Sequence, residues 1–414
     1  MKRISISKDF LLSLFLVSII PLVGYAWSLL KLRRSNARLL ILAVCFFDFF
    51  LALKVPPYQD LFRRYTETYY SYYPGMSLWN ALEGKIDFLF YINSFVFYKL
   101  KLPFFLIPAI YSSLTVYNIY SSYLKIYDNS ISVIGENKSR FLIASIVVIS
   151  FVNVVGIATT LRFGFAASMM INGIIEFYFG KKRKSYLLAA TSILMHASMI
   201  IPAFSVLAAS FLKINRLSTI LLSVICLGIS NVLIKYILIS FNPFGLGTYF
   251  LVGYVDSSWA SFSTDISTLF FISVQYIVIL YFFLNTMKSA AINKGYANFI
   301  NVFAVICFSL TISITVFNRF FNGMFLYFLM FYYLNSKSYI SKHYIIKIAL
   351  IGLIFYNLLF INVYVQRRPI MLGRMYTALY TPPIMNIFYT MTDFNNYLKK
   401  INGKGDWIGH ELGK

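Results

Sequence analysis

The chain has 414 residues, of which 59% are hydrophobic and 12% are charged. Soluble globular domains carry about twice that fraction of charged residues, so the composition excludes the ordinary soluble class. The 37 basic and 14 acidic residues give a formal charge of +23. Most Lys and Arg stand in short runs between apolar blocks, a pattern typical of cytoplasmic loops, and we expect no nucleic acid as a partner.

Apolar blocks of membrane-spanning length follow one another along the chain. Runs rich in Leu, Ile and Phe without alternation favour helices over barrel strands, because in lipid the backbone must satisfy its own hydrogen bonds. At roughly 20 residues a span, the blocks predict an all-α polytopic integral membrane protein with about 11–12 transmembrane segments. The blocks are Phe10–Leu30, Leu39–Leu53, Pro103–Tyr123, Phe141–Ala158, Phe163–Phe179, Tyr186–Leu212, Leu217–Phe241, Ile266–Thr286, Phe299–Phe317, Phe320–Leu334 and Ile345–Val365.

Basic clusters between the blocks predict the orientation. Lys31 to Arg38 and Lys181–Lys184 both carry several positive charges and should be cytoplasmic. For both to lie inside, the block Asp87–Leu100 cannot cross, and its few apolar residues suit an interfacial helix. Residues 54–101 then form a large external region with this interfacial helix.

The block Tyr186–Leu212 has basic residues at both ends, with Lys213 and Arg216 following it. A helical hairpin that breaks near His196 to Pro202 would return the chain to the cytoplasmic side. Broken helices are tolerated in a membrane where they are buried in protein or line a wet cavity.

The whole of residues 1–365 is therefore expected to be one membrane domain, with residues 242–265 as a second external loop. Residues 366–414 form an amphiphilic, Tyr-rich tail that we interpret as an interfacial cap. Cys45, Cys226 and Cys307 lie far apart in apolar blocks, without the spacing of a disulfide framework or zinc site.

Several common chemistries lack their motifs. The chain has no glycine-rich nucleotide loop, no Asp-x-Asp pair and no cluster of metal ligands. We expect neither a cofactor nor a tightly held metal.

Three residues beside or inside apolar blocks are the strongest positive signal, because charge in a membrane costs several kcal/mol unless it is paired or wet. Arg162 opens a block beside small residues and could clamp a phosphate or diphosphate with its guanidinium fork, or it could snorkel to headgroups. His196 lies about eleven residues into its block and could be a general base or a packed histidine. Arg319 has no nearby acid and could be a second anion contact or a headgroup contact.

Acids, arginines and aromatics interleave in the first external region. Such a mixture suits sugar binding, whereas the alternative is an aromatic belt at headgroup level. In the tail, three arginines could face phosphate or headgroups, and Glu176 should pair with Lys181–Lys184. The candidate substrate-binding residues are Asp60, Arg63, Arg64, Tyr65, Glu83, Arg367, Arg368 and Arg374.

Together these segments resemble the O-antigen and exopolysaccharide polymerases of the Wzy/EpsG type. The resemblance covers about Lys54–Leu334 and rests on the order of short motifs more than on any one of them. In chain order these are the Asp60–Tyr65 segment, the apolar block Asp87–Leu100, Leu161-Arg162-Phe163-Gly164-Phe165-Ala166, the basic loop Lys181–Lys184, Met195-His196-Ala197-Ser198, and Asn318-Arg319-Phe320.

The resemblance implies a GT-C-like membrane glycosyltransferase of lipopolysaccharide biosynthesis, in the bacterial inner membrane with its site facing the periplasm. Such an enzyme transfers the growing undecaprenyl-diphosphate-linked polysaccharide onto an incoming undecaprenyl-diphosphate-linked repeat unit. Arg162 and Arg319 would hold the donor diphosphate, and His196, or instead Asp60 or Glu83, would take the acceptor proton. The implied partners are these lipid-linked saccharides, membrane lipid and a chain-length regulator. A lipid-linked oligosaccharide flippase and an O-antigen ligase stay as alternatives.

Overall fold

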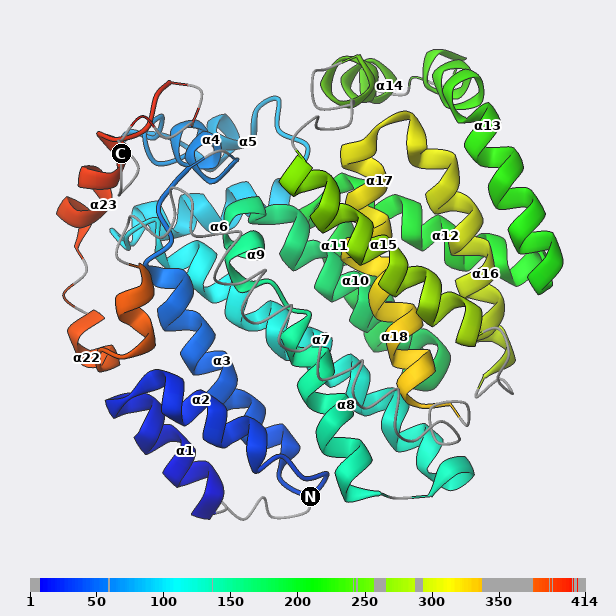
Figure 1. Ribbon diagram of the computed structural model, residues 1–414. Helices are drawn as coiled ribbons and strands as arrows, with labels where there is room; N and C mark the ends of the chain where they lie inside the picture. Colours follow the sequence, from blue (N-terminus) through cyan, green and yellow to red (C-terminus); the bar gives the residue numbers. More distant parts are fainter. Residues whose placement is uncertain are drawn as a thin grey trace.

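The computed structural model describes residues 8–336, with gaps at 59, 136, 241, 243–244, 257–265 and 287–292, and residues 375–408, with gaps at 387, 389, 404 and 406–407. Within these ranges the chain forms helices and no strand (Figure 1). The all-α membrane class predicted from the sequence is confirmed.

The helices follow one another with short connections. In chain order they are α1 (Lys8–Ile19), α2 (Pro21–Leu30), α3 (Ala37–Leu53), α4 (Asp60–Glu67), α5 (Leu78–Leu82), α6 (Phe88–Lys99), α7 (Leu106–Ile134), α8 (Lys138–Ser150), α9 (Val154–Thr160), α10 (Arg162–Phe179), α11 (Lys182–Met195), α12 (Ile200–Phe211), α13 (Arg216–Ser240), α14 (Leu246–Phe250), α15 (Ile266–Thr286), α16 (Lys294–Ser309), α17 (Ile314–Phe320), α18 (Leu326–Leu334), α22 (Pro383–Asn386) and α23 (Met391–Leu398).

Three helical stretches among the described residues are long and apolar enough to cross a membrane. They are Lys138–Thr160, Lys294–Ile312 and Ile314–Leu334, and α13 adds a fourth if its two halves, bent by 65°, form one span. The described residues therefore hold fewer continuous spans than the 11–12 predicted from apolar blocks, because several blocks are broken into shorter helices. The block Ile345–Val365 lies outside the described residues.

The first apolar block is one of the broken ones. Instead of a single span over Phe10–Leu30, the chain ends α1 at Ile19 and starts α2 at Pro21. Proline cannot donate the backbone hydrogen bond that a continuous helix needs. The two helices then pack so closely that a Cβ on Gly24 would clash with the backbone of Val17.

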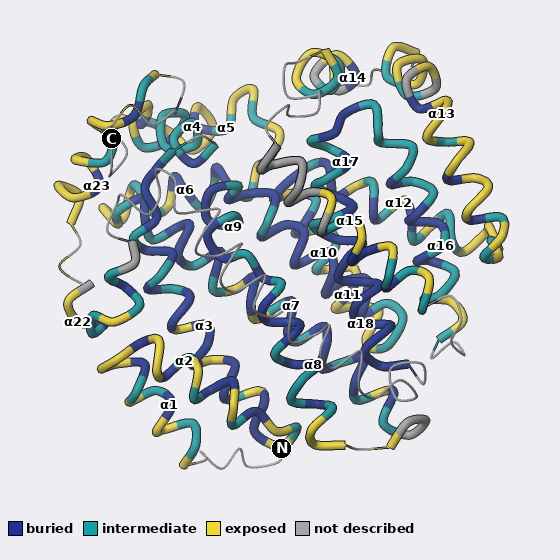
Figure 2. Tube along the Cα trace, viewed as in Figure 1, coloured by how far each residue is buried: buried dark blue, intermediate teal, exposed yellow. Residues whose placement is uncertain are grey.

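The helices α7 and α10 form the buried centre of the molecule (Figure 2). The α7 helix has 29 residues and runs well past the predicted end at Tyr123. The added turns carry Asp128, which forms an ion pair with Arg34, and Lys125, which pairs with Glu176. These partners explain why the helix continues through a polar stretch.

One end of α10 holds the predicted charge cluster. Glu176 is buried, its carboxylate lies 2.8 Å from Lys184 Nζ, and it accepts the backbone N–H of Lys181 at 3.0 Å. The predicted ion pair with the basic loop is therefore present. Arg162 begins α10 at the other end, 176 − 162 = 14 residues before Glu176 and so about 21 Å away at the helical rise.

The predicted broken hairpin is also present. The α11 helix ends at Met195, a short 3₁₀ turn covers Ala197–Met199, and α12 follows. Tyr186 near the start of α11 and Ser210 near the end of α12 line the same cavity of about 300 Å³. The two arms thus return to the same end of the bundle, and the break at His196 lies at the end where α10 begins.

Candidate active site

Arg162 owes its position to an unusual backbone turn. Leu161, between α9 and α10, has φ 41°. This left-handed region is uncommon for a residue with a side chain, and such strain often occurs at functional sites. The turn starts α10 at Arg162, whose side chain is 10% exposed.

Asp87 connects Arg162 to two other elements. Its Oδ2 forms an ion pair with Arg162 Nη1, and its Oδ1 accepts the backbone N–H of Ala197 at 2.9 Å. One carboxylate at the start of α6 therefore holds both the start of α10 and the break in the hairpin. Sequence reasoning did not select Asp87 as a site residue, although an acid opening an apolar block was a usable signal.

Arg162 keeps hydrogen-bonding capacity despite this ion pair. Its Nε is buried and has no acceptor among the described residues. A buried donor without a partner costs free energy, which a bound acceptor recovers. The arrangement can therefore accept an anionic oxygen beside Asp87.

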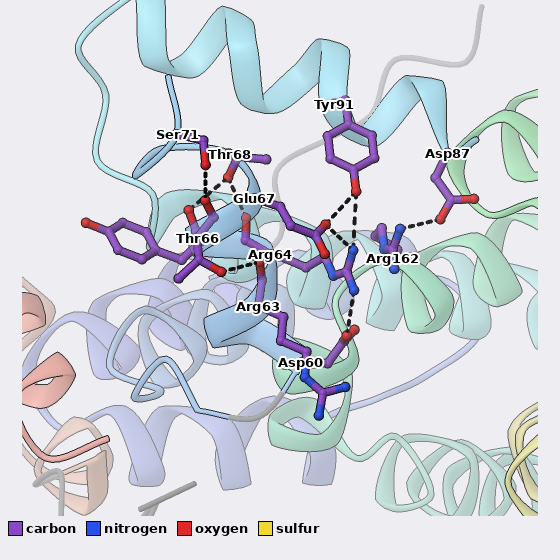
Figure 3. Close-up of polar contacts among 11 residues, drawn as sticks. Asp60, Arg63, Arg64, Thr66, Glu67, Thr68, Ser71, Asp87, Tyr91 and Arg162 are labelled. Atoms are coloured by element: carbon purple, nitrogen blue, oxygen red, sulfur yellow. Dashed lines mark hydrogen bonds and ion pairs between the residues drawn. The ribbon is translucent and has the colours of Figure 1, made fainter. Parts of the chain in front are cut away.

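A second arginine cluster lies beside this pair on α4 (Figure 3). Arg64 forms ion pairs with Asp60 at 3.1 Å and with Glu67, and its Nη1 lies 3.2 Å from the hydroxyl of Tyr91. Tyr91 in turn donates to Glu67 at 2.7 Å. The network places two acids and one arginine of the predicted first external region next to Arg162.

Burial and charge set the acid–base properties here. Burial raises the pKa of the Asp87 carboxyl, against the opposing effects of Arg162 and the Ala197 N–H. Burial lowers the pKa of Arg64, but the carboxylates of Asp60 and Glu67 raise it by more, so the pKa of Arg64 is raised overall. Arg64 is therefore a permanent cation, while Asp87 loses its charge at a higher pH than an ordinary aspartate.

His196 caps the break in the hairpin. Its Nδ1 accepts the Ser198 backbone N–H at 3.3 Å and lies 2.8 Å from the Ser198 hydroxyl. The imidazole packs edge-on against Phe163 with ring centroids 5.5 Å apart. Ser198 thus fixes the orientation of the ring.

Arg319 differs from its predicted position. The predicted blocks Phe299–Phe317 and Phe320–Leu334 leave it in the connection between two spans, but it lies inside α17, and the chain turns earlier, at Leu310–Ser313. The Ser313 hydroxyl caps α17 by accepting the Val316 N–H at 3.5 Å, so the helix starts before the polar pair Asn318-Arg319.

The guanidinium of Arg319 lies over the rings of Phe163 and Tyr254, 5.5 Å from each centroid, and it lies 3.4 Å from the Tyr254 hydroxyl. No acid in the described ranges lies within ion-pair distance of it. Stacking on aromatic faces orients the fork and leaves its charge free to meet an anion.

A cavity of about 210 Å³ brings His196 and Arg319 together, and we call it the Arg319 pocket. Ser198, Tyr254 and Ser313 also line it, with apolar residues of α12, α13 and α17 forming most of the remaining wall. A pocket with a few convergent polar groups in an apolar setting is the usual form of a ligand site.

The remaining predicted residues are distributed differently. Tyr65 turns away from Arg64 and packs its ring 5.1 Å from that of Phe394 in the tail. Glu83 is exposed at the end of α5, and Arg63 lies on α4. Arg367, Arg368 and Arg374 lie outside the described residues.

No group of three or more His, Cys, Asp or Glu residues able to hold a metal ion occurs in the described part of the chain. What the site does offer is a set of arginines, one histidine and carboxylates, gathered from α4, α6, α10, α17 and the hairpin break. Such a set can bind an anion, stabilise a charged leaving group and move a proton.

Comparison with known protein families gives a match over most of the chain. The model of the EpsG family matches residues 37–382, which is more than four-fifths of the chain. No curated protein and no solved structure matches significantly.

Proposed function

The chain belongs to the EpsG family, which supports a polysaccharide polymerase type of function in a membrane, and from this premise we propose that it is an O-antigen polymerase. It would transfer the growing polysaccharide from undecaprenyl diphosphate onto the non-reducing end of a new lipid-linked repeat unit. The site would face the periplasm from the bacterial inner membrane.

The observation that carries this proposal is the Arg319 pocket. It joins an arginine that has no acid partner among the described residues to a histidine held by a serine, inside a largely apolar wall. A lipid diphosphate has the matching chemistry, since it is an anion attached to a long apolar chain.

In the proposed reaction, the acceptor hydroxyl attacks the anomeric carbon of the donor as the bond to the diphosphate oxygen breaks. Arg319 and Arg162 stabilise the negative charge that develops on undecaprenyl diphosphate, the leaving group. His196 takes the proton of the attacking hydroxyl.

The Ser198 backbone N–H donates to Nδ1 of His196, which favours the tautomer with its proton on Nε2. For Nε2 to act as the base, the proton must instead be on Nδ1 and be donated to the Ser198 hydroxyl, and this contact then replaces the one to the backbone N–H. Asp87 completes the site by fixing Arg162 relative to the hairpin break.

The test is the glycan banding of lipopolysaccharide from a deletion strain. We expect a core carrying one repeat unit, and long chains when the wild-type gene is restored. Arg162→Ala, His196→Ala and Arg319→Ala, at matched membrane levels, should each fail to restore long chains. Arg183→Ala is the matched control, because Arg183 is exposed at the opposite end of the bundle.

Other outcomes identify other functions. A deletion strain without even one surface repeat would indicate a flippase, and polymer left on undecaprenyl diphosphate would indicate a ligase. Normal long chains in the deletion strain would refute the proposal. Full activity of the three variants would remove the site assignment.

A further inference from the structure

We propose that a second groove at the same end of the molecule binds an acidic segment of the glycan. This inference rests on the proposed polymerase function and names a substrate class for it. The groove, which we call the tail groove, has a volume of about 690 Å³ and lies between the first external region and the C-terminal tail. Its size falls in the range of pockets that enclose small-molecule ligands.

Two tyrosine rings form a fixed wall of the tail groove. Tyr69 and Tyr98 pack edge to face, 5.7 Å apart, and their hydroxyls donate to the backbone carbonyls of Leu102 at 2.8 Å and Tyr72 at 3.0 Å. The internal hydrogen bonds hold the rings in place before a ligand arrives. Preorganised aromatic faces suit sugar rings, because the ordering cost is already met.

The charge of the groove points to an anion. Lys99 and Lys101 both line it and are exposed, and no acidic residue lines it. Lys99 Nζ donates to the Pro74 carbonyl at 2.6 Å, whereas the Lys101 ammonium has no partner in the part of the chain that the structure describes. Lys101 also has φ 57°, a strained backbone for a non-glycine residue.

The opposite wall comes from the tail. Thr390 and Met391 line the groove, and they lie beyond residue 382, where the family match ends. Phe394 anchors this segment, since it is fully buried against Tyr65, Phe104 and Phe105 with ring centroids 5.1 to 6.0 Å apart. Because this wall lies outside the region that the family shares, its residues could determine which glycan this particular chain binds.

The tail groove is connected to the site through α4. The ring of Tyr65 stacks on that of Tyr69 at 6.5 Å, and Tyr65 is the neighbour of Arg64 in the chain. A glycan segment in the groove would thus lie beside the arginine cluster while its reacting end reaches the Arg319 pocket.

The experiment measures binding of oligosaccharides released from the cell's own polymer to the purified full-length protein in nanodiscs. The probes are the native oligosaccharides and the same material after its acidic groups are removed by carboxyl reduction or dephosphorylation. We expect the double variant Lys99→Gln/Lys101→Gln to bind native oligosaccharides about tenfold more weakly than wild type. Wild type should bind the neutralised probe just as weakly.

Lys399→Gln is the matched control, because this exposed lysine directly follows α23, lies outside the groove and should leave binding unchanged. Met391→Ala should weaken binding with less effect than the double lysine variant. The proposal is overturned by a polymer without acidic groups, by equal binding of the double variant and wild type, or by a lysine effect seen only with anionic-lipid nanodiscs.

A separate assay keeps this proposal distinct from the polymerase proposal. The groove variants should still join lipid-linked units but give shorter chains, while Arg319→Ala should stop joining and retain oligosaccharide binding. If the wild-type protein binds the oligosaccharides but never joins units, the polymerase proposal fails and the glycan groove stands.

Discussion

At the scale of single residues, Asp87 is the group whose charge the site depends on. Burial raises its pKa, and its ionised form holds Arg162 and the hairpin break. As pH falls, Asp87 should take up a proton at a higher pH than an ordinary aspartate, and Arg162 then loses its partner. We predict that activity falls on acidification through this raised pKa, measured as joining of lipid-linked units in membranes over a pH series.

The variant Asp87→Asn should abolish this fall of activity at low pH, because no carboxyl remains at this position to take up a proton. Its activity should be low at every pH, about 10²-fold below wild type, since a misplaced Arg162 no longer meets the donor correctly. Asp128→Asn breaks the ion pair with Arg34 near the C-terminal end of α7. It serves as the control and should leave the pH profile unchanged. If the activity of Asp87→Asn still fell at low pH, another titrating group would control the pH dependence.

Substitutions of Arg319 can distinguish the effect of its positive charge from the effect of its planar guanidinium shape. Arg319→Lys keeps the cation but loses the planar fork that stacks between Phe163 and Tyr254. We predict a partial loss of activity for Arg319→Lys and a loss of about 10²- to 10³-fold for Arg319→Ala. The same membrane assay checks this, and wild-type activity in Arg319→Lys would mean that charge alone is sufficient.

At the scale of elements, the hairpin break depends on one serine. Ser198→Ala keeps the backbone N–H that donates to His196 Nδ1 but removes the hydroxyl that lies 2.8 Å from the same nitrogen. The loss of one hydrogen bond to the base should lower the rate about 2- to 10-fold, with Ser198→Thr close to wild type. An unchanged rate in Ser198→Ala would show that the backbone contact alone orients the imidazole.

The elements also show what sequence reasoning could and could not reach. The break at His196 was predictable, because basic residues at both ends of one apolar block imply that the chain enters and leaves the membrane on the same side. The break at Pro21 was not predicted although the proline marks it, because the apolar block continues on both sides of it. The helical position of Arg319 was not predicted either, since it depends on the cap at Ser313. Asp87 was missed for a related reason: its partners are 75 and 110 residues away in the chain.

At the scale of the whole molecule, the two ends of the bundle differ in chemistry. Glu176 and the basic loop Lys181–Lys184 occupy one end, while Arg162, His196 and the docked tail residue Phe394 belong to the other. The positive-inside rule assigns the first end to the cytoplasm. The candidate site should then face the periplasm, where lipid-linked repeat units would be joined.

This orientation predicts the labelling of two single-cysteine variants made after Cys45, Cys226 and Cys307 are replaced by Ala. Glu83 is exposed near the site, and Lys182 is exposed in the basic loop. A membrane-impermeant maleimide should label Glu83→Cys in spheroplasts and Lys182→Cys only after lysis. Retained polymerisation by both variants is the control for folding. The reverse labelling pattern would place Arg162 and His196 in the cytoplasm and would exclude periplasmic transfer from a lipid diphosphate.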